Sequence, residues 1–355
     1  MAKTKINEKF IYKVGRFIRR FFIWIISTAI LLVLCLLLLL YLVIFGPSTY
    51  VKELFVVSAM ESSVGGIMAQ IYLSDEEIAA IQEKNKTEET TEITDVSLIH
   101  FESNKVTYDN DDSVIAGMEI DPDGDGIDVF DVNGPTYIGK MMVVYDPSRV
   151  IVGVCNGFSL ETYGLTLPQM CKKYNAVAGV NGGKYDDEAG MGTGGMPEGV
   201  VISQGQLLMG DMYGVYTTYG FTEDNVLVVG SMSPAYALSI GVRDAVSFGP
   251  TLVVNGTAAN VYGASSGLNP RTAIGQRADG AVLLLVIEGR QSYSIGATYA
   301  DLIQIMLDYG AINAANLDGG MSSTMYYNDE LIIQSASMSD SRRIPTGFVV
   351  LGLEE

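Results

Sequence analysis

The chain has 355 residues, a formal net charge of −19, one histidine and three cysteines. Such an acidic chain repels phosphate backbones, so we expect no nucleic-acid partner. A single histidine also excludes paired-histidine phosphodiesterases, histidine-rich zinc sites and HExxH peptidases. His100 lies in the strand-like stretch VSLIHFES and is interpreted as a structural residue rather than a member of a Ser-His-Asp triad.

The first 45 residues differ in kind from the rest. Residues 1–20 carry seven basic side chains and one acid, a net charge of +6 that leaves −25 for residues 21–355. Residues 21–45 carry no charge, and as a helix they would span roughly 37 Å, more than a hydrocarbon core of about 30 Å. This apolar run is longer than that of a cleavable signal peptide. The pattern predicts a cytoplasmic basic tail, an uncleaved single-pass anchor through the lipid bilayer, and an extracellular remainder.

Residues 46–95 are predicted to form a helical stalk followed by a polar linker. Residues 50–73 have a helical, moderately apolar pattern, whereas the Thr/Glu/Lys-rich stretch 82–95 is typical of a solvated linker. From 96 to 355, short β-branched runs and many glycines indicate a globular domain of the α+β class.

An acidic loop, DPDGDGID, lies at residues 121–128 of this domain. Asp121, Asp123 and Asp125 match the opening of an EF-hand-type loop, but Val132 stands where the bidentate glutamate belongs. We expect either an acidic hairpin turn or a structural Ca²⁺ site, and no cofactor for catalysis. Cys155 and Cys171 could form a disulfide or remain two buried thiols.

Two strand–helix–strand units are predicted further along. The first has a strand at 149–155, a helix at 167–174 and a strand at 176–180 that ends in Asn181-Gly182-Gly183. Its last strand, YNAVAGVNGG, is similar to YGAINAANLDGG in the second unit. The similarity reflects either an internal duplication or chance.

In the second unit, the apolar run 281–287 predicts a buried strand, 299–309 a helix, and 311–317 a strand. Strands joined by a crossover helix run parallel, so their carboxyl ends meet at one sheet edge, where ligands bind in open α/β sheets. Glu288-Gly-Arg290 and Asp318-Gly-Gly would therefore share that edge. The expected fold is α+β, a mixed β-sheet domain with βαβ crossover units behind one transmembrane helix.

Three motifs in this order resemble the phosphodiester glycosidase family. They lie in VAGVNGGKYDDEAGMGTGGMPEGVVISQGQ at 177–206, NPRTAIGQRADGAVLLLVIEGR at 269–290 and NLDGGMSST at 316–324. The family includes the mammalian α-N-acetylglucosaminidase that uncovers mannose 6-phosphate, and bacterial proteins associated with exopolysaccharide biosynthesis. Glu288 departs from the family, in which an aspartate often stands at that position.

The resemblance implies a hydrolase that cleaves the bond between a sugar's anomeric carbon and a phosphodiester oxygen. Its leaving group is a weakly basic phosphomonoester, so a carboxylate and an anion-binding site are the main requirements. Asp318 and Glu288 are the predicted catalytic carboxylates. Arginine forks, glycine amides and hydroxyls would bind phosphate and sugar oxygens. The predicted substrate-binding residues are Arg271, Arg290, Asn181, Gly182, Gly183, Thr272, Gly319, Gly320, Ser322, Ser323 and Thr324.

Each of these residues also has a simpler interpretation, because Asp-Gly and Gly-Gly pairs are ordinary turn chemistry. Their convergence on one sheet edge favours a site. The Gly-x-Ser-x-Gly elbow of serine hydrolases is absent from NLDGGMSST. Two alternatives remain: a non-catalytic glycan-binding or exopolysaccharide-assembly factor, and a calcium-dependent adhesion module.

Overall fold

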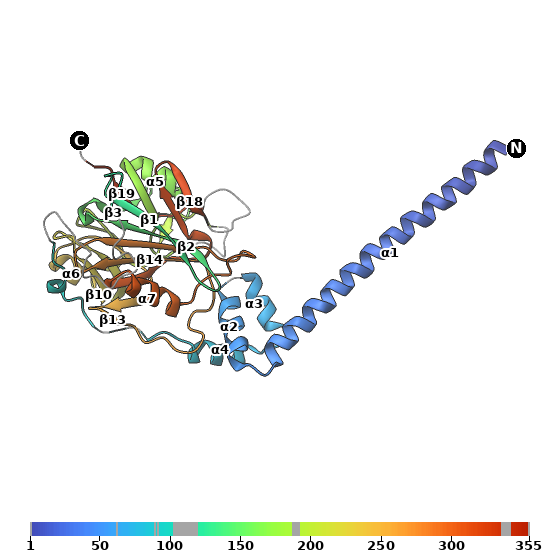
Figure 1. Cartoon of the computed structure of the whole chain (residues 1–355), viewed down its shortest axis with the longest axis horizontal. Helices are drawn as coiled ribbons and strands as arrows, with labels where there is room; N and C mark the ends of the chain where they lie inside the picture. The colour runs from blue at the N-terminus through green and yellow to red at the C-terminus, as the bar shows by residue number, and fades with distance from the viewer. Residues whose placement is uncertain are drawn as a thin grey trace.

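The structure is a computed structural model that describes residues 2–353 except 62, 89, 91, 102–119, 187–191 and 335–341. One long helix leads away from a globular part, and three short helices surround its base (Figure 1). The four are α1 (Ala2–Phe45), α2 (Thr49–Met60), α3 (Ser63–Gln70) and α4 (Asp75–Lys84).

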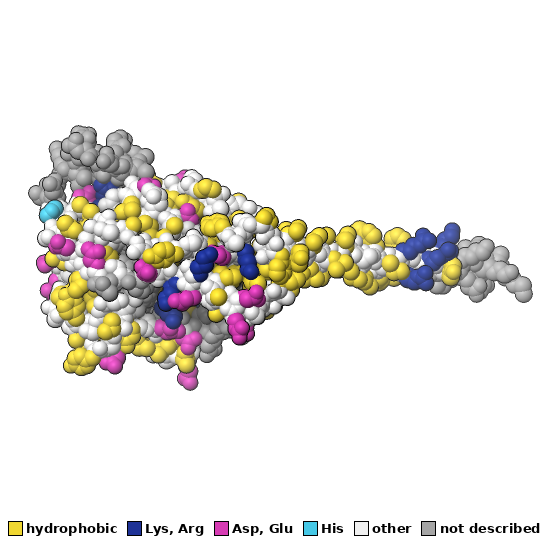
Figure 2. All heavy atoms as spheres, turned by 90° about the horizontal axis from the view of Figure 1, so that it is seen from below, with side chains coloured by type: hydrophobic (Ala, Val, Ile, Leu, Met, Phe, Trp, Pro, Cys, Tyr) yellow, Lys and Arg dark blue, Asp and Glu magenta, His cyan; other side chains and the backbone are white. Residues whose placement is uncertain are grey.

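Helix α1 joins the predicted tail and anchor without a break. Its stretch Tyr12–Phe45 is long and apolar enough to cross a membrane, and 18 consecutive residues within it have a mean hydropathy of 3.1. Lys and Arg side chains form a band toward its far end, followed by an apolar surface (Figure 2). The predicted helical structure of 50–73 is present as α2 and α3. Ser74 and Glu77 form the capping box of α4.

The stretch 82–95 is mostly exposed, as its composition predicts, but two of its side chains are buried against the domain. Asn85 and Thr94 are buried. The Ala264 amide donates to Asn85 Oδ1 at 2.6 Å, and the Val229 amide donates to Thr94 Oγ1 at 2.9 Å. Polar side chains that would suit solvent here satisfy backbone groups of the domain instead, because buried N–H groups require acceptors.

Three β-sheets form the domain. In spatial order, the first contains β1 (Ile127–Asn133), β2 (Ile138–Val144), β15 (Val282–Ile287), β14 (Arg271–Arg277), β16 (Ala311–Leu317), β12 (Thr251–Val254) and β13 (Thr257–Ala258). The second contains β10 (Leu227–Met232), β9 (Tyr216–Thr222), β11 (Val242–Ser247), β7 (Val201–Ser203) and β8 (Gln206–Met209). The third contains β18 (Glu330–Gln334), β17 (Thr324–Tyr327), β4 (Ala176–Asn181), β19 (Thr346–Leu351) and β3 (Val150–Val154).

The shorter elements are β5 (Tyr185–Asp186), paired with β6 (Met196–Pro197), and the 3₁₀ turns η1 (Val96–Leu98), η3 (Pro147–Arg149) and η5 (Gly320–Ser322). Turn η1 replaces the strand expected around His100. That histidine is exposed.

Both crossover units are confirmed, with one difference. Strands β15 and β16 each pair antiparallel with β14, and β3 and β4 each pair antiparallel with β19. The two strands of each unit therefore run parallel, as predicted, but a third strand lies between them. In the described part of the chain every strand pairing is antiparallel, because each crossover skips one position in its sheet.

The inner faces of the three sheets share one apolar core, which includes Ile274 of β14, Phe221 of β9 and Phe348 of β19. One helix covers the outer face of each sheet: α7 (Tyr299–Asp308) the first, α6 (Pro234–Ser239) the second and α5 (Leu167–Tyr174) the third. The continuous apolar sequence of β15 is explained by this sandwich position, since all six of its residues are buried.

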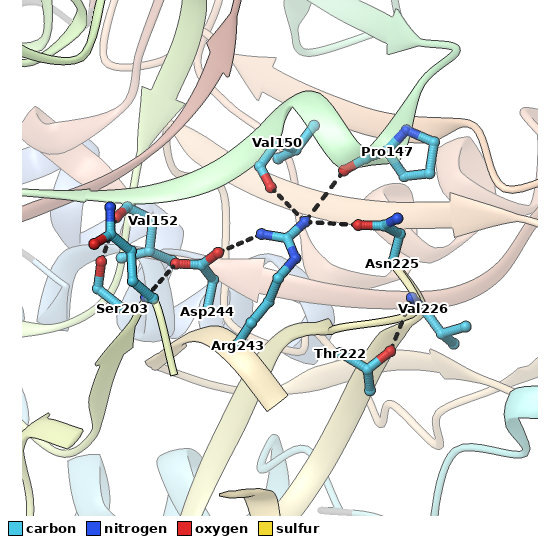
Figure 3. Close-up of polar contacts among 10 residues, drawn as sticks. Pro147, Val150, Val152, Ser203, Thr222, Asn225, Val226, Arg243 and Asp244 are labelled. Carbon is cyan, nitrogen blue, oxygen red and sulfur yellow. Dashed lines mark hydrogen bonds and ion pairs between the residues drawn. The ribbon is translucent and has the colours of Figure 1, made fainter. Parts of the chain in front are cut away.

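A buried ion pair ties the second sheet to the third (Figure 3). Arg243 pairs with Asp244, and its Nη2 donates to the Val150 carbonyl at 3.0 Å and to Asn225 Oδ1 at 3.0 Å. Only 2% of the Asp244 side chain is exposed. The pair therefore aligns β11 with the start of β3, the strand that opens the first crossover unit.

We expect Asp244→Ala to lower the free energy of unfolding by about 3–5 kcal/mol, because it leaves a buried guanidinium without its counter-charge. Chemical denaturation would measure the change. Lys86→Ala breaks an exposed pair with Glu83 and is the control, with an expected loss below about 1 kcal/mol. Equal losses in the two variants would contradict the role assigned to Asp244.

Candidate active site

The two crossover units meet at the residues that follow β4 and β16. The Asp318 amide donates to the Gly182 carbonyl at 3.1 Å, and Asn181 Nδ2 donates to the Asp318 carbonyl at 2.6 Å. Asn181 Oδ1 in turn accepts from Thr272 Oγ1 at 2.7 Å and from the Thr324 amide at 3.2 Å. Asn181 is fully buried. Its side chain thus fixes the turn that carries Asp318, which is a positioning role.

A cavity of about 450 Å³ opens beside this junction. It contains several residues predicted from the sequence, namely Asp318, Gly319, Gly320, Ser322, Arg271 and Arg290. It is also lined by Glu61, Lys184, Tyr185, Phe248, Asn269, Tyr299, Met321 and Arg342.

The cavity is positively charged within a strongly acidic protein. Its lining includes four basic side chains, Lys184, Arg271, Arg290 and Arg342, and two acidic ones, Asp318 and Glu61. Like charges at close quarters cost free energy unless an anion is bound between them. The lining therefore suits an anionic ligand held beside a carboxylate.

The two predicted arginines are held by the protein in different ways. Arg271 is buried, with Nε donating to the Ala297 carbonyl at 3.2 Å and Nη2 to Ser266 Oγ at 2.6 Å. Arg290 Nη2 donates to the Glu61 carbonyl at 3.1 Å. Partial burial and the charge of Arg271 lower the pKa of Arg290, and Glu61 opposes the shift. A guanidinium has five N–H groups, so these bonds leave donors for a ligand.

The predicted role of the glycine amides needs correction. The amides of Gly182 and Gly183 donate to the carbonyl and the hydroxyl of Thr346. The amides of Gly319 and Gly320 donate to Asp318 Oδ1 and to the Pro270 carbonyl. All four are thus engaged by the protein. Glycine is needed at two of these positions for steric and conformational reasons. A Cβ on Gly183 would lie 2.5 Å from the Ser247 carbonyl oxygen, and Gly320 has φ +61°, which L side chains rarely adopt.

Glu288 follows β15 at the predicted sheet edge but is not among the residues that line the cavity. Its backbone is fixed by Ile138 and Ser294. Its carboxylate faces the hydroxyl of Tyr293, where its charge raises the pKa of that tyrosine. The structure therefore brings one of the two predicted catalytic carboxylates to the cavity and leaves the other outside.

The three hydroxyls of NLDGGMSST divide between cavity and interior. Ser322 Oγ lies 3.0 Å from Tyr185 Oη, which also accepts from Arg342 Nε at 2.8 Å. Ser323 and Thr324 are buried outside the cavity lining, as is Thr272. Thr324 Oγ1 donates to the Ile333 carbonyl. Ligand binding by these three buried residues stays a prediction.

The sequence patterns did not identify Tyr185, Arg342 or Glu61. Tyr185 lies two residues after Gly183, within the first motif. Arg342 comes from a segment far along the chain with no motif of its own. Glu61 ends α2, so a domain boundary drawn at residue 96 hides its contribution.

Burial and the nearby charge of Asp318 raise the pKa of Tyr185 to about 12. The folded protein therefore keeps this proton when the unfolded chain, with a tyrosine pKa near 10, loses it. Stability from Tyr185 is complete below about pH 10 and is lost as the pH rises toward 12. We expect Tyr185→Phe to reduce the loss in unfolding free energy between pH 9 and 11.5 by about 2 kcal/mol. Tyr213→Phe, at an exposed position, is the control, and an unchanged profile for Tyr185→Phe would contradict the assignment.

The acidic loop brings its three predicted carboxylates together. Oxygen atoms of Asp121, Asp123 and Asp125 lie within 4.8 Å of one another. Asp125 Oδ2 also accepts from Tyr327 Oη at 2.7 Å. Both interpretations of the loop fit this arrangement, because carboxylates close turns as well as bind calcium. If calcium binds, millimolar Ca²⁺ added after chelation raises the melting temperature. An unchanged value favours the acidic turn.

The sequence profile of the phosphodiester glycosidase family matches residues 174–351, which include both glycine turns and the whole β14–α7–β16 region. The chain belongs to the phosphodiester glycosidase family. Among curated proteins it is 31% identical over 173 residues to the SPbeta prophage-derived uncharacterized protein YomE of Bacillus subtilis. That match covers 44% of the chain, which spans about a quarter (25%) of the relative's length.

One solved structure with a TM-score above 0.5 supports the same fold. The catalytic domain of zebrafish N-acetylglucosamine-1-phosphodiester α-N-acetylglucosaminidase, auto-inhibited by its pro-peptide, superposes with a TM-score of 0.51 at 22% identity. The superposition covers 63% of this chain and 82% of the zebrafish domain. A hypothetical protein from Synechocystis gives a TM-score of 0.42 at 16% identity, with 63% and 62% covered.

Proposed function

We propose that this protein is a membrane-anchored, extracytoplasmic hydrolase that cleaves the sugar C1–O bond of a sugar-1-phosphodiester in an envelope or secreted glycan. The observation that carries the proposal is Asp318, a carboxylate in a cavity with four basic side chains. The family supports glycosidase chemistry, and the zebrafish neighbour makes an α-linked N-acetylglucosamine the first sugar to test.

In this mechanism the arginines bind the phosphodiester and Asp318 acts at the anomeric carbon, as nucleophile or as the base that directs water. Cleavage releases a phosphomonoester, whose negative charge increases as the bond breaks. Arg271 and Arg290 would stabilise that charge most strongly in the transition state. The leaving group is weakly basic, so Asp318 could act without a second carboxylate as general acid.

The proposal of a membrane anchor is based on α1 alone. Its charge-free stretch and basic amino-terminal segment favour a single span with the amino terminus in the cytoplasm. Glycan substrates of the cell envelope would then lie on the same side of the membrane as the cavity.

Hydrolysis of a panel of sugar-1-phosphodiesters by the full chain in detergent, run in ¹⁸O-labelled water, tests the reaction. Label in the released sugar supports C1–O cleavage, whereas label in the phosphate would show P–O cleavage and overturn the proposal. Binding of the panel without release would favour a glycan-binding or assembly factor. Calcium-dependent binding to a cell-surface partner, with no requirement for the cavity, would favour an adhesion module.

A further inference from the structure

At its carboxyl-terminal end, α1 is covered by protein on one side and exposed on the other. Leu38 and Leu39 are 58% and 59% exposed, but Leu40 and Ile44 are 4% and 2% exposed. Leu40 and Ile44 lie one turn apart and therefore on one face of α1. Ile44 packs in a small core with residues of α2, α3 and α4. The last two turns of α1 thus belong partly to the helical base.

The turn after α3 contacts α1 at a defined position along the length of α1. Tyr72, just beyond α3, donates from Oη to the Leu37 carbonyl at 3.0 Å, and its ring lies 6.0 Å from those of Tyr41 and Phe45. Leu37 precedes the end of α1 by eight residues, or about 12 Å along the helix. A bilayer reaching Phe45 would therefore submerge the end of α3. From Phe21 to Leu37 the helix has 17 residues, the shortest typical span.

The exposed side of α3 and of the turn after it carries two large apolar side chains. Ile67 of α3 and Ile71 of the turn are 65% and 46% exposed. The exposed Gln70 between them donates to Asp75 Oδ1 at 3.2 Å. Residues 62–73 contain no charged side chain, although residues 46–95 as a whole contain ten acids and three bases. A helix exposed to water on this face would ordinarily carry polar residues there. Exposed apolar side chains gathered in this way mark an interaction surface.

We propose that the α3 apolar face, defined as Ile67 of α3 and Ile71 of the turn after it, lies in the headgroup region of the outer leaflet of the bilayer. This inference rests on the anchor of the proposed function. The lipid surface is favoured because Tyr72, next to Ile71, contacts α1 at Leu37, inside the apolar span of that helix. Tyr72, Tyr41 and Phe45 supply the aromatic side chains typical of the membrane–water boundary. The acids Asp75, Glu76 and Glu77 begin the next helix, α4, and remain in water.

Single-cysteine labelling of the full chain tests this placement. Cys35→Ala removes the exposed native thiol, and Cys155 and Cys171 are buried. Ile67→Cys and, as a matched control on α4, Glu76→Cys would each carry an environment-sensitive fluorophore in phosphatidylcholine vesicles. We expect lipid-borne nitroxides to quench the fluorophore at position 67 at least about threefold more than the one at 76, and aqueous iodide to show the reverse order.

Three other outcomes would overturn the inference. Equal iodide quenching at both positions, in protein that survives a carbonate wash, would leave the anchor intact and remove α3 from the bilayer. Protection of position 67 from both quenchers, varying with the protein-to-lipid ratio, would instead indicate contact with a second copy of the chain. Release of the protein by the wash would mean that the anchor itself fails, whereas the labelled-water assay reports on the glycosidase reaction independently.

Discussion

Asp318→Asn is expected to abolish sugar release while leaving substrate affinity within a few-fold of wild type. The amide retains the size of the side chain and an oxygen that can accept from the Gly319 amide, as Asp318 Oδ1 does at 3.0 Å. It removes the charge that a nucleophile or base needs, so we expect kcat to fall by about 10²–10⁴-fold. Released sugar and equilibrium binding of the intact diester, measured on the same preparation, separate the two effects.

Glu288→Gln is the matched control because it changes the other predicted catalytic carboxylate, which does not line the cavity. We expect kcat and KM to stay within about threefold of wild type. A loss in Glu288→Gln as large as that in Asp318→Asn would show that the two carboxylates act together. The structural placement of the active centre would then be wrong and the prediction from the sequence right.

Removal of helices α2–α4 is expected to have the second-largest effect on activity. A fragment of residues 96–355 would lose the Ser58 Oγ acceptor of the Leu268 amide, at 2.8 Å, and the Asn85 acceptor of the Ala264 amide. The loop before Arg271 would then be unsupported. Because small displacements of binding groups cost about 10² in rate, we expect kcat/KM to fall by that order relative to a fragment of 46–355. The melting temperature should fall as well.

Glu61→Ala in the full chain separates the contribution of the Glu61 side chain to activity from that of its backbone carbonyl. It keeps the carbonyl that accepts from Arg290 Nη2 and removes only the carboxylate, so activity close to wild type would assign the effect to the backbone. If the 96–355 fragment proves as active as 46–355, then α2–α4 are a spacer and not part of the active site.

The sequence predicted the regular elements best where several signals agreed. Helix α5 begins after Thr166 and α7 after Thr298, each with a capping box that the structure contains. The buried run of β15 and the shared sheet edge followed from apolar continuity and crossover geometry. The intervening strands β14 and β19 could not be placed, because long-range pairing leaves no periodic signal in the strands themselves.

The candidate site was predictable only in part for a related reason. Asp318 and Arg271 lie in motifs and reach the cavity. Glu288 lies in a motif too, but the direction of its side chain depends on the loop that carries Tyr293. The availability of an amide depends on acceptors elsewhere in the chain, such as Thr346 for Gly182. Glu61 and Arg342 reach the site from segments at opposite ends of the chain, a convergence that only the folded structure contains.

Only three residues, Gly46, Pro47 and Ser48, connect α1 to α2, and the end of α2 already lines the cavity. With the proposed anchor, so short a tether would confine the search of the enzyme for substrate to two dimensions. Substrates attached to the same membrane would encounter the cavity at a high effective concentration, because linkage confines both partners to a thin layer. Glycans released into the bulk would gain nothing from this confinement. The tether itself would therefore select among chemically identical phosphodiesters according to where they are attached.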